Sequence, residues 1–305
     1  MARYYKSVYP TVITVLFIVS VVRINIEREH VNGGFVHYDD IQRDEISSEQ
    51  NATVIGCNFC RYDVPAVSND YKQKYLKLRE REYNETIVIL TPLRDTAKFL
   101  EHFGTMLNTL SYPHDLISVF FAEEGSSDNT FESAKALTLQ LNKYFGFKEA
   151  QVNQRERRTH LSRVRNALLD YGMRDNDWVL WIDSDIENVP TDLIQQFLNV
   201  STDVMTVACL VKKNGHTMNY DFNTRRFGDE KCGDYCLPFL RHEGRVVRLD
   251  IVGTSVLMVR SDVHRKVRFP EVRERLESEG FAINAKKMGY EIVGLPFVEV
   301  YHYFA

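Results

Sequence analysis

The chain has 305 residues, a formal net charge of −4 at pH 7 and 44% hydrophobic residues. That length allows one large domain or two small ones with a sizeable core. The balance of charge lacks the basic excess that nucleic-acid-binding proteins carry. Five cysteines are too few for a disulfide scaffold. The composition therefore indicates a globular protein that does not bind nucleic acid.

The N-terminal residues have the pattern of a membrane signal-anchor. Residues 7–22 hold no charged side chain, follow Arg3 and Lys6, and precede Arg23. A membrane span typically needs about 20 apolar residues, but a thinner internal membrane accommodates a shorter one. A cleaved signal peptide is the alternative. Because no small-residue cleavage site follows, we expect an uncleaved anchor preceded by a cytoplasmic tail, residues 1–6.

Residues 23–84 are polar and irregular, which is typical of a stem between an anchor and a domain. Asn51, Asn84 and Asn199 each begin an N-glycosylation sequon, which favours a luminal location for everything after the anchor. The chain is therefore predicted to be a single-pass protein of type II whose bulk is luminal.

The cysteines fall into two near pairs and one isolated residue. Cys57 with Cys60, and Cys232 with Cys236, are predicted to form disulfides in the oxidising lumen. Zinc binding is less favoured because no histidine completes either pair, and the disulfide pairing itself stays open. Cys209 lies in an apolar run and is predicted to be a buried thiol.

The globular domain is predicted to cover residues 85–305 and to open with alternating strands and helices. Residues 86–90 and 116–122 are apolar runs with strand character, and residues 97–110 and 131–141 are predicted helices. Strands that alternate with helices predict an α/β fold with a mostly parallel sheet flanked by helices.

The second strand runs into an acidic turn, Glu123 to Thr130, with the sequence EEGSSDNT. Ser127 or Asp128 would cap the helix that follows. Alternatively, a carboxylate of this turn, such as Glu124, would accept hydrogen bonds from a ribose or a base, as acidic residues do in other nucleotide sites.

A basic segment, residues 155–166, precedes the next strand and has helical spacing. Arg158 and Arg165 lie seven positions apart and share a helix face, whereas Arg163 points elsewhere. A charge run of this kind often marks only a solvated helix. An arginine directed at a diphosphate would instead stabilise the departing charge, and Arg165 is the best candidate for that role.

The stretch 177–186, DWVLWIDSDI, organises the chain. Its apolar part, residues 178–182, reads as a short strand that is buried on both faces. Asp183 and Asp185 follow at the end of this strand, the edge at which open α/β sheets bind ligands. Two carboxylates suit Mg²⁺ or Mn²⁺ that carries a diphosphate. An ordinary turn after a strand is the alternative.

The C-terminal part of the chain alternates again between apolar runs and polar segments. Residues 204–211, 249–259, 292–295 and 298–301 are predicted strands, and Gly253 indicates a close backbone approach. The polar segment 212–245 is the natural place for acceptor recognition. Glu279 lies in the first turn of a predicted helix, where the helix dipole alone favours an acidic residue. His302 follows the last strand and offers a third metal ligand.

Several motifs stand in a consistent order: ILTPLRD at residues 89–95, SRVRNALL at 162–169, WVLWIDSDI at 178–186, DIVGTSVLMVRSDVHR at 250–265, SEGFAINAKKMGYEIVGLP at 278–296, and VYHY at 300–303. Through them the chain resembles, from about residue 85 to its C-terminus, the fungal Golgi mannosyltransferase family of Mnn9, Anp1 and Van1. These are nucleotide-sugar glycosyltransferases of the GT-A type.

The resemblance implies a GT-A, Rossmann-like fold in a Golgi membrane protein that uses GDP-mannose and Mn²⁺ (or Mg²⁺). It also implies retaining α-mannosyl transfer to a glycan, and hetero-oligomers with related subunits. Asp183, Asp185 and His302 match the metal site. The loop after the first strand, which holds the nucleotide, is matched by Thr91, Pro92, Leu93, Arg94 and Asp95.

Three further roles follow from the same resemblance. Arg165 matches a basic position beside the diphosphate, and Asp185 and Glu279 match catalytic positions, with Glu279 on the acceptor side. The acidic turn that holds Glu124 departs from the family and looks more like that of inverting family-2 enzymes. Retention or inversion therefore stays open. Another nucleotide-sugar donor, or a non-catalytic subunit with a glycosyltransferase fold, is the alternative function.

Overall fold

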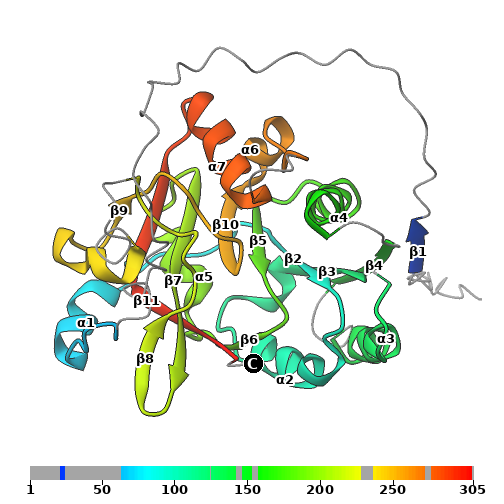
Figure 1. Ribbon diagram of the computed structural model, residues 1–305, viewed down its shortest axis with the longest axis horizontal. Helices are drawn as coiled ribbons and strands as arrows, with labels where there is room; N and C mark the ends of the chain where they lie inside the picture. The colour runs from blue at the N-terminus through cyan, green and yellow to red at the C-terminus, as the bar shows by residue number, and fades with distance from the viewer. Residues whose placement is uncertain are drawn as a thin grey trace, which may run out of the picture.

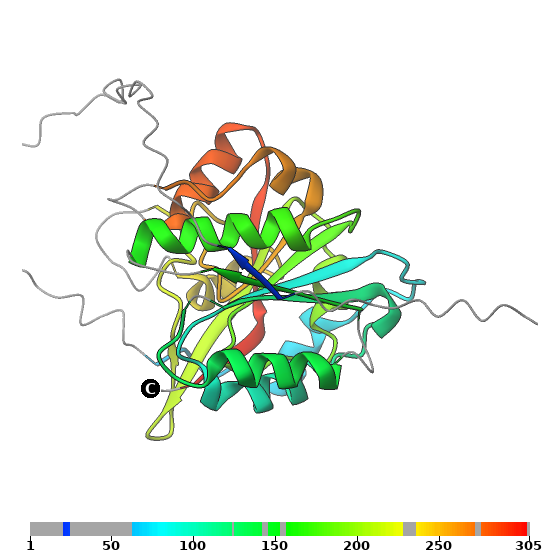
Figure 2. The same ribbon diagram turned by 90° about the vertical axis from the view of Figure 1, so that its right-hand side faces the viewer.

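The computed structural model describes residues 63–123, 125–141, 146–152, 157–227, 236–271 and 276–303, together with the short strand β1 (Val21–Ile24). An 11-stranded sheet forms the centre of the molecule. The strand order along its main path is β1-β4-β3-β2-β5-β10-β7-β11-β6. Helices cover both faces of the sheet (Figures 1 and 2).

One half of the sheet is parallel, as the alternation of strands and helices predicts. Its strands are β2 (Ile87–Leu93), β3 (Ile117–Glu123), β4 (Gly146–Val152) and β5 (Trp178–Ile182). Two helices, α2 (Ala97–Asn108) and α3 (Thr130–Leu141), lie on one face, and α4 (Arg157–Gly172) lies on the other (Figure 2). The predicted helices and strands of this half are confirmed, apart from β4, whose polar sequence gave no strand signal.

The other half of the sheet is mixed. Its strands are β6 (Ile186–Asn188), β7 (Val204–Lys213), β8 (His216–Asn219), β9 (Val247–Arg248), β10 (Val256–Arg260) and β11 (Ile292–His302). β10 is antiparallel to both β5 and β7, whereas β11 is parallel to β7. The accompanying helices are α5 (Leu193–Leu198), α6 (Ser261–Lys266) and α7 (Glu277–Lys287), with short 3₁₀ turns η2 (His114–Leu116) and η3 (Leu237–Glu243).

Several of the predicted strands have different bounds in the structure. The run 249–259 is a strand only from Val256, because the residues before it approach Asp221 in an irregular conformation. The runs 292–295 and 298–301 form one continuous strand, β11, rather than two. Its register on β7 shifts between Leu295 and Glu299, around Pro296, which has no N–H to donate.

The hydrophobic core has two large parts, one on each face of the sheet, and a small third cluster of Val64, Ala208 and Leu210. Ile89, Phe103 and Leu180 belong to the part beneath α2 and α3, and Leu90, Val164 and Trp181 belong to the part beneath α4. Every residue of β5 is buried. Burial on both faces explains why residues 178–182 form a continuous apolar run rather than an alternating one. It also fixes the position of the acidic residues that follow.

The segment before β2 contacts the domain, although the sequence assigned residues 23–84 to a stem. Helix α1 (Asn69–Leu76) places the Tyr75 ring against Phe297, with centroids 4.2 Å apart. The backbone N–H of Val64 donates to the Thr217 carbonyl oxygen at 2.8 Å. The described part of this segment, residues 63–84, therefore packs on the globular domain.

Several of the sequence predictions fall on residues that lie outside the described ranges. That is so for residues 7–20 of the predicted anchor, and also for Asn51, Cys57, Cys60 and Cys232. Val21 and Val22, the last residues of that predicted span, lie in β1, which pairs with β4. Within the described ranges no helix is both long and apolar enough to cross a membrane. Cys209 is buried as predicted, and Cys236 is buried too.

Candidate active site

Asp183 and Asp185 follow β5 at its carboxyl end, as the sequence predicts. The backbone N–H of Asp183 donates to the carbonyl oxygen of Ser255 at 3.0 Å, which ties the end of β5 to the chain that enters β10. The N–H of Ile186 then donates to the Asp183 carbonyl oxygen at 3.2 Å and closes a turn. The turn holds both carboxylates at the sheet edge and leads directly into β6.

The end of β11 brings His302 to Asp185. β6 pairs antiparallel with β11, and Ile186 lies opposite His302. His302 Nε2 lies 3.1 Å from an Oδ atom of Asp185, and His302 Nδ1 lies 2.6 Å from the Tyr303 carbonyl oxygen. The Tyr220 ring stacks on the imidazole, with centroids 3.6 Å apart. Two of the three predicted metal ligands are therefore in direct contact.

The charge state of His302 depends on that contact. Burial lowers the pKa of His302, but the hydrogen bond and the negative charge of Asp185 raise it more, and the pKa lies above its ordinary value. Both ring nitrogens face oxygen acceptors. The arrangement therefore favours an imidazolium that donates from Nδ1 and Nε2 at once.

Arg165 of helix α4 contacts the other carboxylate. Its Nη2 donates to Asp183 Oδ1 at 3.2 Å, and its Nε lies 3.4 Å from Glu277 Oε1. The guanidinium lies over the Trp181 ring, 5.1 Å from the centroid, and only 2% of Arg165 is exposed. Arg165 Nη1 is buried and has no hydrogen-bond partner. The site therefore contains a fixed cation whose Nε and Nη1 both lack a hydrogen-bond acceptor among the described residues.

Opposing effects act on the pKa of Asp183. Burial raises it, Arg165 lowers it and Asp185 raises it, with the result at about 6. Two carboxylates this close repel each other unless a positive charge lies near them. Arg165 and His302 supply that charge, one to each carboxylate.

The residues at this edge have the donor chemistry of a divalent-cation site. Two carboxylates and an imidazole suit Mn²⁺. His302 Nδ1 faces the backbone carbonyl of Tyr303, so in the neutral ring the lone pair would lie on Nε2, on the side of Asp185. A backbone carbonyl that accepts from one ring nitrogen orients metal-binding histidines in the same way. Within the described ranges, however, no group of three His, Cys, Asp or Glu side chains is arranged to hold a metal ion.

The first-strand residues that the sequence placed in a nucleotide-binding loop lie partly inside β2. Thr91, Pro92 and Leu93 pair in register with β3, opposite Phe121 to Glu123. Thr91 and Leu93 are fully buried, so they do not present side chains on an open loop. The loop itself begins at Arg94, whose guanidinium lies 3.6 Å from the Asp95 carboxylate.

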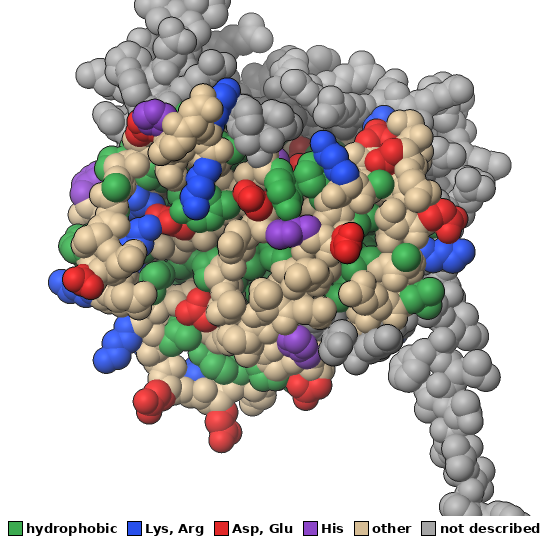
Figure 3. Space-filling model, turned by 90° about the horizontal axis from the view of Figure 1, so that it is seen from below, with side chains coloured by type: hydrophobic (Ala, Val, Ile, Leu, Met, Phe, Trp, Pro, Cys, Tyr) green, Lys and Arg blue, Asp and Glu red, His purple; other side chains and the backbone are tan. Residues whose placement is uncertain are grey.

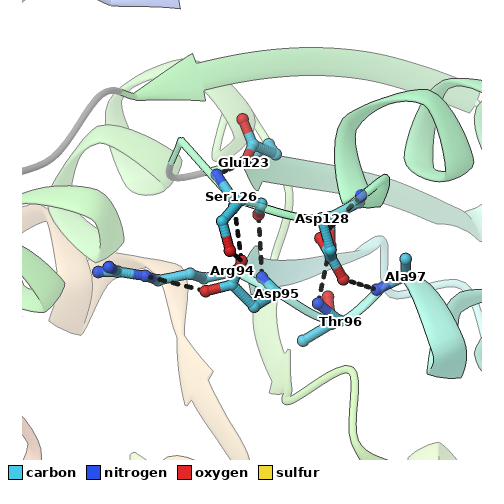
Figure 4. Close-up of polar contacts among 9 residues, drawn as sticks. Arg94, Asp95, Thr96, Ala97, Glu123, Ser126 and Asp128 are labelled. Atoms are coloured by element: carbon cyan, nitrogen blue, oxygen red, sulfur yellow. Dashed lines mark hydrogen bonds and ion pairs between the residues drawn. The ribbon is translucent and has the colours of Figure 1, made fainter.

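Asp95 connects that loop to the acidic turn (Figure 4). Its φ is 50°, a left-handed conformation that is uncommon outside glycine. Asp95 Oδ1 accepts from the N–H of Ser127 at 2.7 Å, and the Asp95 N–H donates to Ser126 Oγ at 2.9 Å. Hydrogen bonds from Ser127 keep the pKa of Asp95 below its ordinary value. The carboxylate predicted to bind nucleotide thus holds two loops together.

The acidic turn is organised by its own carboxylates. Glu123 Oε1 accepts from the N–H of Ser126 at 2.5 Å. Asp128 accepts from the N–H of Thr130 at 3.0 Å, as a helix cap does, and also from the N–H of Ala97 at 3.1 Å. Asp128, one of the two predicted caps, therefore bonds the start of α3 from one residue before the N-cap Asn129, whose carbonyl oxygen accepts from the N–H of Ser133 at 3.0 Å. Glu124, the predicted ligand of this turn, lies outside the described residues.

Two acidic residues near the site were not assigned from the sequence. Glu277, in the first turn of α7, is the buried acid that faces Arg165, whereas the predicted Glu279 lies in the same turn and is partly exposed. Helical spacing alone does not tell which of the two faces the sheet. Asp221, on the segment after β8, is buried, and burial raises its pKa.

Gly253 makes the close approach that the sequence predicts. A Cβ built on it would lie 2.0 Å from Asp221 Oδ2, and the Gly253 N–H donates to Thr224 Oγ1 at 3.0 Å. Asp221 is itself held by Thr224 Oγ1 at 2.6 Å and by the N–H of Asn223 at 2.9 Å. This contact fixes the segment that carries Tyr220 over His302.

Strand β11 ends on the lower side of the molecule in Figure 1, close to the C-terminus. Seen from that side, the surface carries histidine and acidic side chains close together (Figure 3).

Comparison with solved structures defines the class of the fold. The mannosyltransferase PcManGT from Pyrobaculum calidifontis, solved in complex with GDP-Man and Mn²⁺, superposes with a TM-score of 0.52 over 76% of this chain and 62% of its own, at 14% identity. Residues 1–349 of S. aureus TarS give 0.50 over 71% and 60%, at 15% identity. The fold is therefore a GT-A-like α/β fold.

Comparison with sequences defines the family. The Anp1 family model matches residues 67–152 and 136–232. The mannan polymerase complex subunit mnn9 of Schizosaccharomyces pombe is 30% identical over 273 residues, which cover 72% of this chain and 80% of the relative. The Anp1 subunit of mannan polymerase II from Saccharomyces cerevisiae is 24% identical over 302 residues, 78% of this chain and 60% of the relative. The chain belongs to the Anp1 family, as the resemblance implied.

Proposed function

We propose that the protein transfers mannose from GDP-mannose to a hydroxyl group of a glycan and forms an α-mannosidic bond. Its relatives are named as subunits of mannan polymerase complexes, and a protein with the same fold is a mannosyltransferase that binds GDP-Man and Mn²⁺. The observation that carries the proposal is the acidic pair at the end of β5, with His302 against Asp185 and Arg165 against Asp183.

In this proposal Asp183, Asp185 and His302 hold a divalent cation, Mn²⁺ or Mg²⁺. When bound, the cation neutralises charge on the diphosphate as it leaves the sugar. Arg165 adds a positive charge on a planar guanidinium, whose geometry suits a diphosphate oxygen. Its unused Nη1 is a donor for a diphosphate oxygen. Trp181 and Glu277 hold the guanidinium in place, so little reorganisation is needed during transfer.

The nucleotide and acceptor sides of the site rest on the family resemblance. Arg94 and Glu124 remain proposed contacts of the nucleotide, and Glu279 remains the proposed group that orients or deprotonates the acceptor hydroxyl. By analogy with the named complexes, the protein acts in the Golgi membrane with its domain in the lumen, as a partner of related subunits.

A non-catalytic role is the second candidate. Asp183 is already paired with Arg165, and in the described part of the chain no three acidic, histidine or cysteine side chains form a complete metal site. A subunit that only scaffolds a complex would not need a complete metal site. A transferase that uses a different nucleotide sugar is the third candidate, because Glu124, a proposed contact of the nucleotide, lies outside the described residues.

The test is GDP release by the purified chain, with GDP-mannose as donor and α-mannobiose as acceptor, in Mn²⁺ and again after chelation by EDTA. We expect turnover only with the metal, and a loss of about 100-fold or more in Asp185→Asn and in His302→Gln. Asp175→Asn, on an exposed turn, is the matched control.

Each alternative has its own result in this assay. Equal turnover in the site variants and the wild type would contradict the proposed metal site. Turnover with a UDP-sugar in place of GDP-mannose would support the third candidate. No turnover with any donor, together with no stabilisation by GDP and Mn²⁺ in thermal melting, would support the non-catalytic subunit.

A further inference from the structure

A pocket lies beside the candidate active site, lined by residues of α1, α5, β6 and the C-terminal part of β11. Its volume is about 390 Å³, within the range of small-molecule sites. Asp185 directly precedes β6, whereas Glu187 and Asn188 of the same strand line the pocket. Neither Asp185 nor His302 belongs to its lining, so the pocket is separate from the proposed metal site.

One wall of the pocket is fixed by ion pairs around Glu299. This carboxylate lies 2.7 Å from Lys72 Nζ and 2.6 Å from Arg241 Nη2. It also accepts a hydrogen bond from the Tyr301 hydroxyl at 3.0 Å. These contacts satisfy the carboxylate and orient the Tyr301 ring. Glu299 is therefore engaged by groups of the chain itself, and this wall is formed without a ligand.

Other polar groups of the pocket are exposed and have no such partners. Glu187 and Asn188 are exposed on β6, and their side chains make no hydrogen bond or ion pair with the described part of the chain. Lys212 lies over the Tyr301 ring, 4.4 Å from the centroid, and faces no described carboxylate within ion-pair distance. The pocket thus offers an acceptor, an amide that both donates and accepts, and a donor.

This combination identifies the chemistry of the ligand. The lining carries charges of both signs, on Lys72 and Lys212 and on the carboxylates of Glu187, Asp192 and Glu299. An anion or a cation would meet like charge, whereas a neutral ligand would not. Hydroxyl groups donate and accept at the same time and so use all the unpaired groups. The partly exposed ring of Tyr301 offers an aromatic surface to the hydrocarbon face of a sugar ring.

We propose that this pocket, at Glu187, Asn188, Lys212 and Tyr301, binds a neutral glycan segment of the acceptor chain. The inference rests on the proposed function, because it makes the pocket a second binding point for the glycan that receives the sugar. β6 joins this pocket directly to Asp185. An acceptor chain bound there would therefore lie next to the proposed site of transfer.

Titration of the purified chain with α-mannopentaose by calorimetry tests the pocket. The variants are Glu187→Gln combined with Asn188→Ala, and Lys212→Met, which changes one exposed side chain. Glu132→Gln, on the exposed face of α3, is the matched control. We expect Kd to rise about tenfold or more in the first variant and several-fold in the second, as hydrogen bonds to charged groups are lost. Thermal melting of each variant checks its fold.

The outcomes separate this inference from the proposed function. If wild type binds the glycan and the pocket variants bind it equally well, or if wild type binds pyrophosphate but no glycan, the inference is overturned. Weaker binding in the folded pocket variants, with the control unchanged, supports it. If the pocket variants bind the glycan more weakly but the wild type releases no GDP from any donor, the pocket is still a glycan site. The proposed transferase activity is then overturned.

Discussion

Trp181 donates its indole N–H to Nε2 of His264 at 3.0 Å, and both side chains are fully buried. His264 Nδ1 faces the carbonyl oxygen of Val267 at 3.4 Å. The neutral tautomer with its proton on Nδ1 satisfies both contacts. Since the Arg165 guanidinium lies over the Trp181 ring, this buried histidine supports the residue that holds Arg165 against Asp183.

The first prediction concerns the pH dependence of stability. Burial lowers the pKa of His264 from 6.5 to about 3. Below pH 6.5 the unfolded chain takes up a proton at this histidine and the folded chain does not. The stability contributed here is therefore fully present above pH 6.5 and is lost as the pH falls toward 3, by up to about 1.4 kcal/mol per pH unit.

Urea unfolding of wild type and His264→Gln at pH 7.5, 6 and 5 measures this contribution. Glutamine keeps a hydrogen-bonding side chain but does not titrate, so the difference in free energy of unfolding between the two proteins should shrink as the pH falls. His302, whose pKa is raised, acts in the opposite direction and cancels in this difference. Two parallel pH profiles would contradict the assignment of a neutral His264.

The elements that the sequence predicted well are those with long apolar patterns. β5, β7 and α2 are recognisable because their burial is continuous or has helical period. β6 is only three residues long and is a strand solely through its pairing with β11. No local pattern predicts it, yet it is the element that joins the acidic pair to His302.

The bounds of β2 show a different limit of sequence reasoning. Thr91 and Pro92 looked like the end of a strand, because proline lacks an N–H. In the structure β2 pairs with β5 only as far as Leu90, whereas its pairing with β3 continues to Leu93. Pro92 therefore lies where the strand is bonded on one side, a position that tolerates proline. Neighbouring strands, not the local sequence, set the bound.

The candidate site was predictable in its metal-binding part and less so around it. Asp183, Asp185 and His302 were identified from the end of a strand and from a resemblance, and the structure brings Asp185 and His302 together. Glu277 and Tyr220 were not assigned roles, because their position depends on how α7 and the segment after β8 pack. Contacts between segments that are distant in the chain produce no local pattern in the sequence from which they could be predicted.

The second prediction concerns Arg165. Lysine at this position keeps the charge but loses the planar fork that contacts Asp183 and stacks on Trp181. We expect Arg165→Lys to lower the rate of GDP release from GDP-mannose by about 100-fold, as the loss of one positioned donor does elsewhere. Arg163→Lys, on the same helix but exposed and paired with Glu271, is the control. Full activity in Arg165→Lys would show that Arg165 is only structural.

The third prediction concerns the carboxylate that connects two helices. Asp128 accepts hydrogen bonds from the N–H groups of Thr130, at the start of α3, and Ala97, at the start of α2 (Figure 4). Asp128→Ala leaves both donors without this acceptor and should lower the free energy of unfolding by about 2 kcal/mol. Denaturant unfolding measures it, with Asp175→Ala as the exposed control. A change below about 0.5 kcal/mol would mean that water replaces the cap.

The fourth prediction concerns the contact between Gly253 and Asp221. A methyl group on Gly253 would meet all three carboxyl atoms of Asp221, at 2.0 to 2.5 Å. The Asp221 carboxylate cannot move away without losing its hydrogen bonds to Thr224 Oγ1 and to the N–H of Asn223. We therefore expect Gly253→Ala to cost about 1 to 3 kcal/mol in the free energy of unfolding, as overpacking of a core does.

A double-mutant cycle distinguishes this clash from a general intolerance of change at Gly253. Asp221→Ala alone removes hydrogen bonds and should destabilise the protein, but it also makes room for the new methyl group. Gly253→Ala should therefore cost much less in the Asp221→Ala background than in the wild type, with a coupling energy of about 1 kcal/mol or more. Additive effects would mean that the strain lies elsewhere in the backbone, and that the approach of Gly253 to Asp221 does not fix the segment carrying Tyr220.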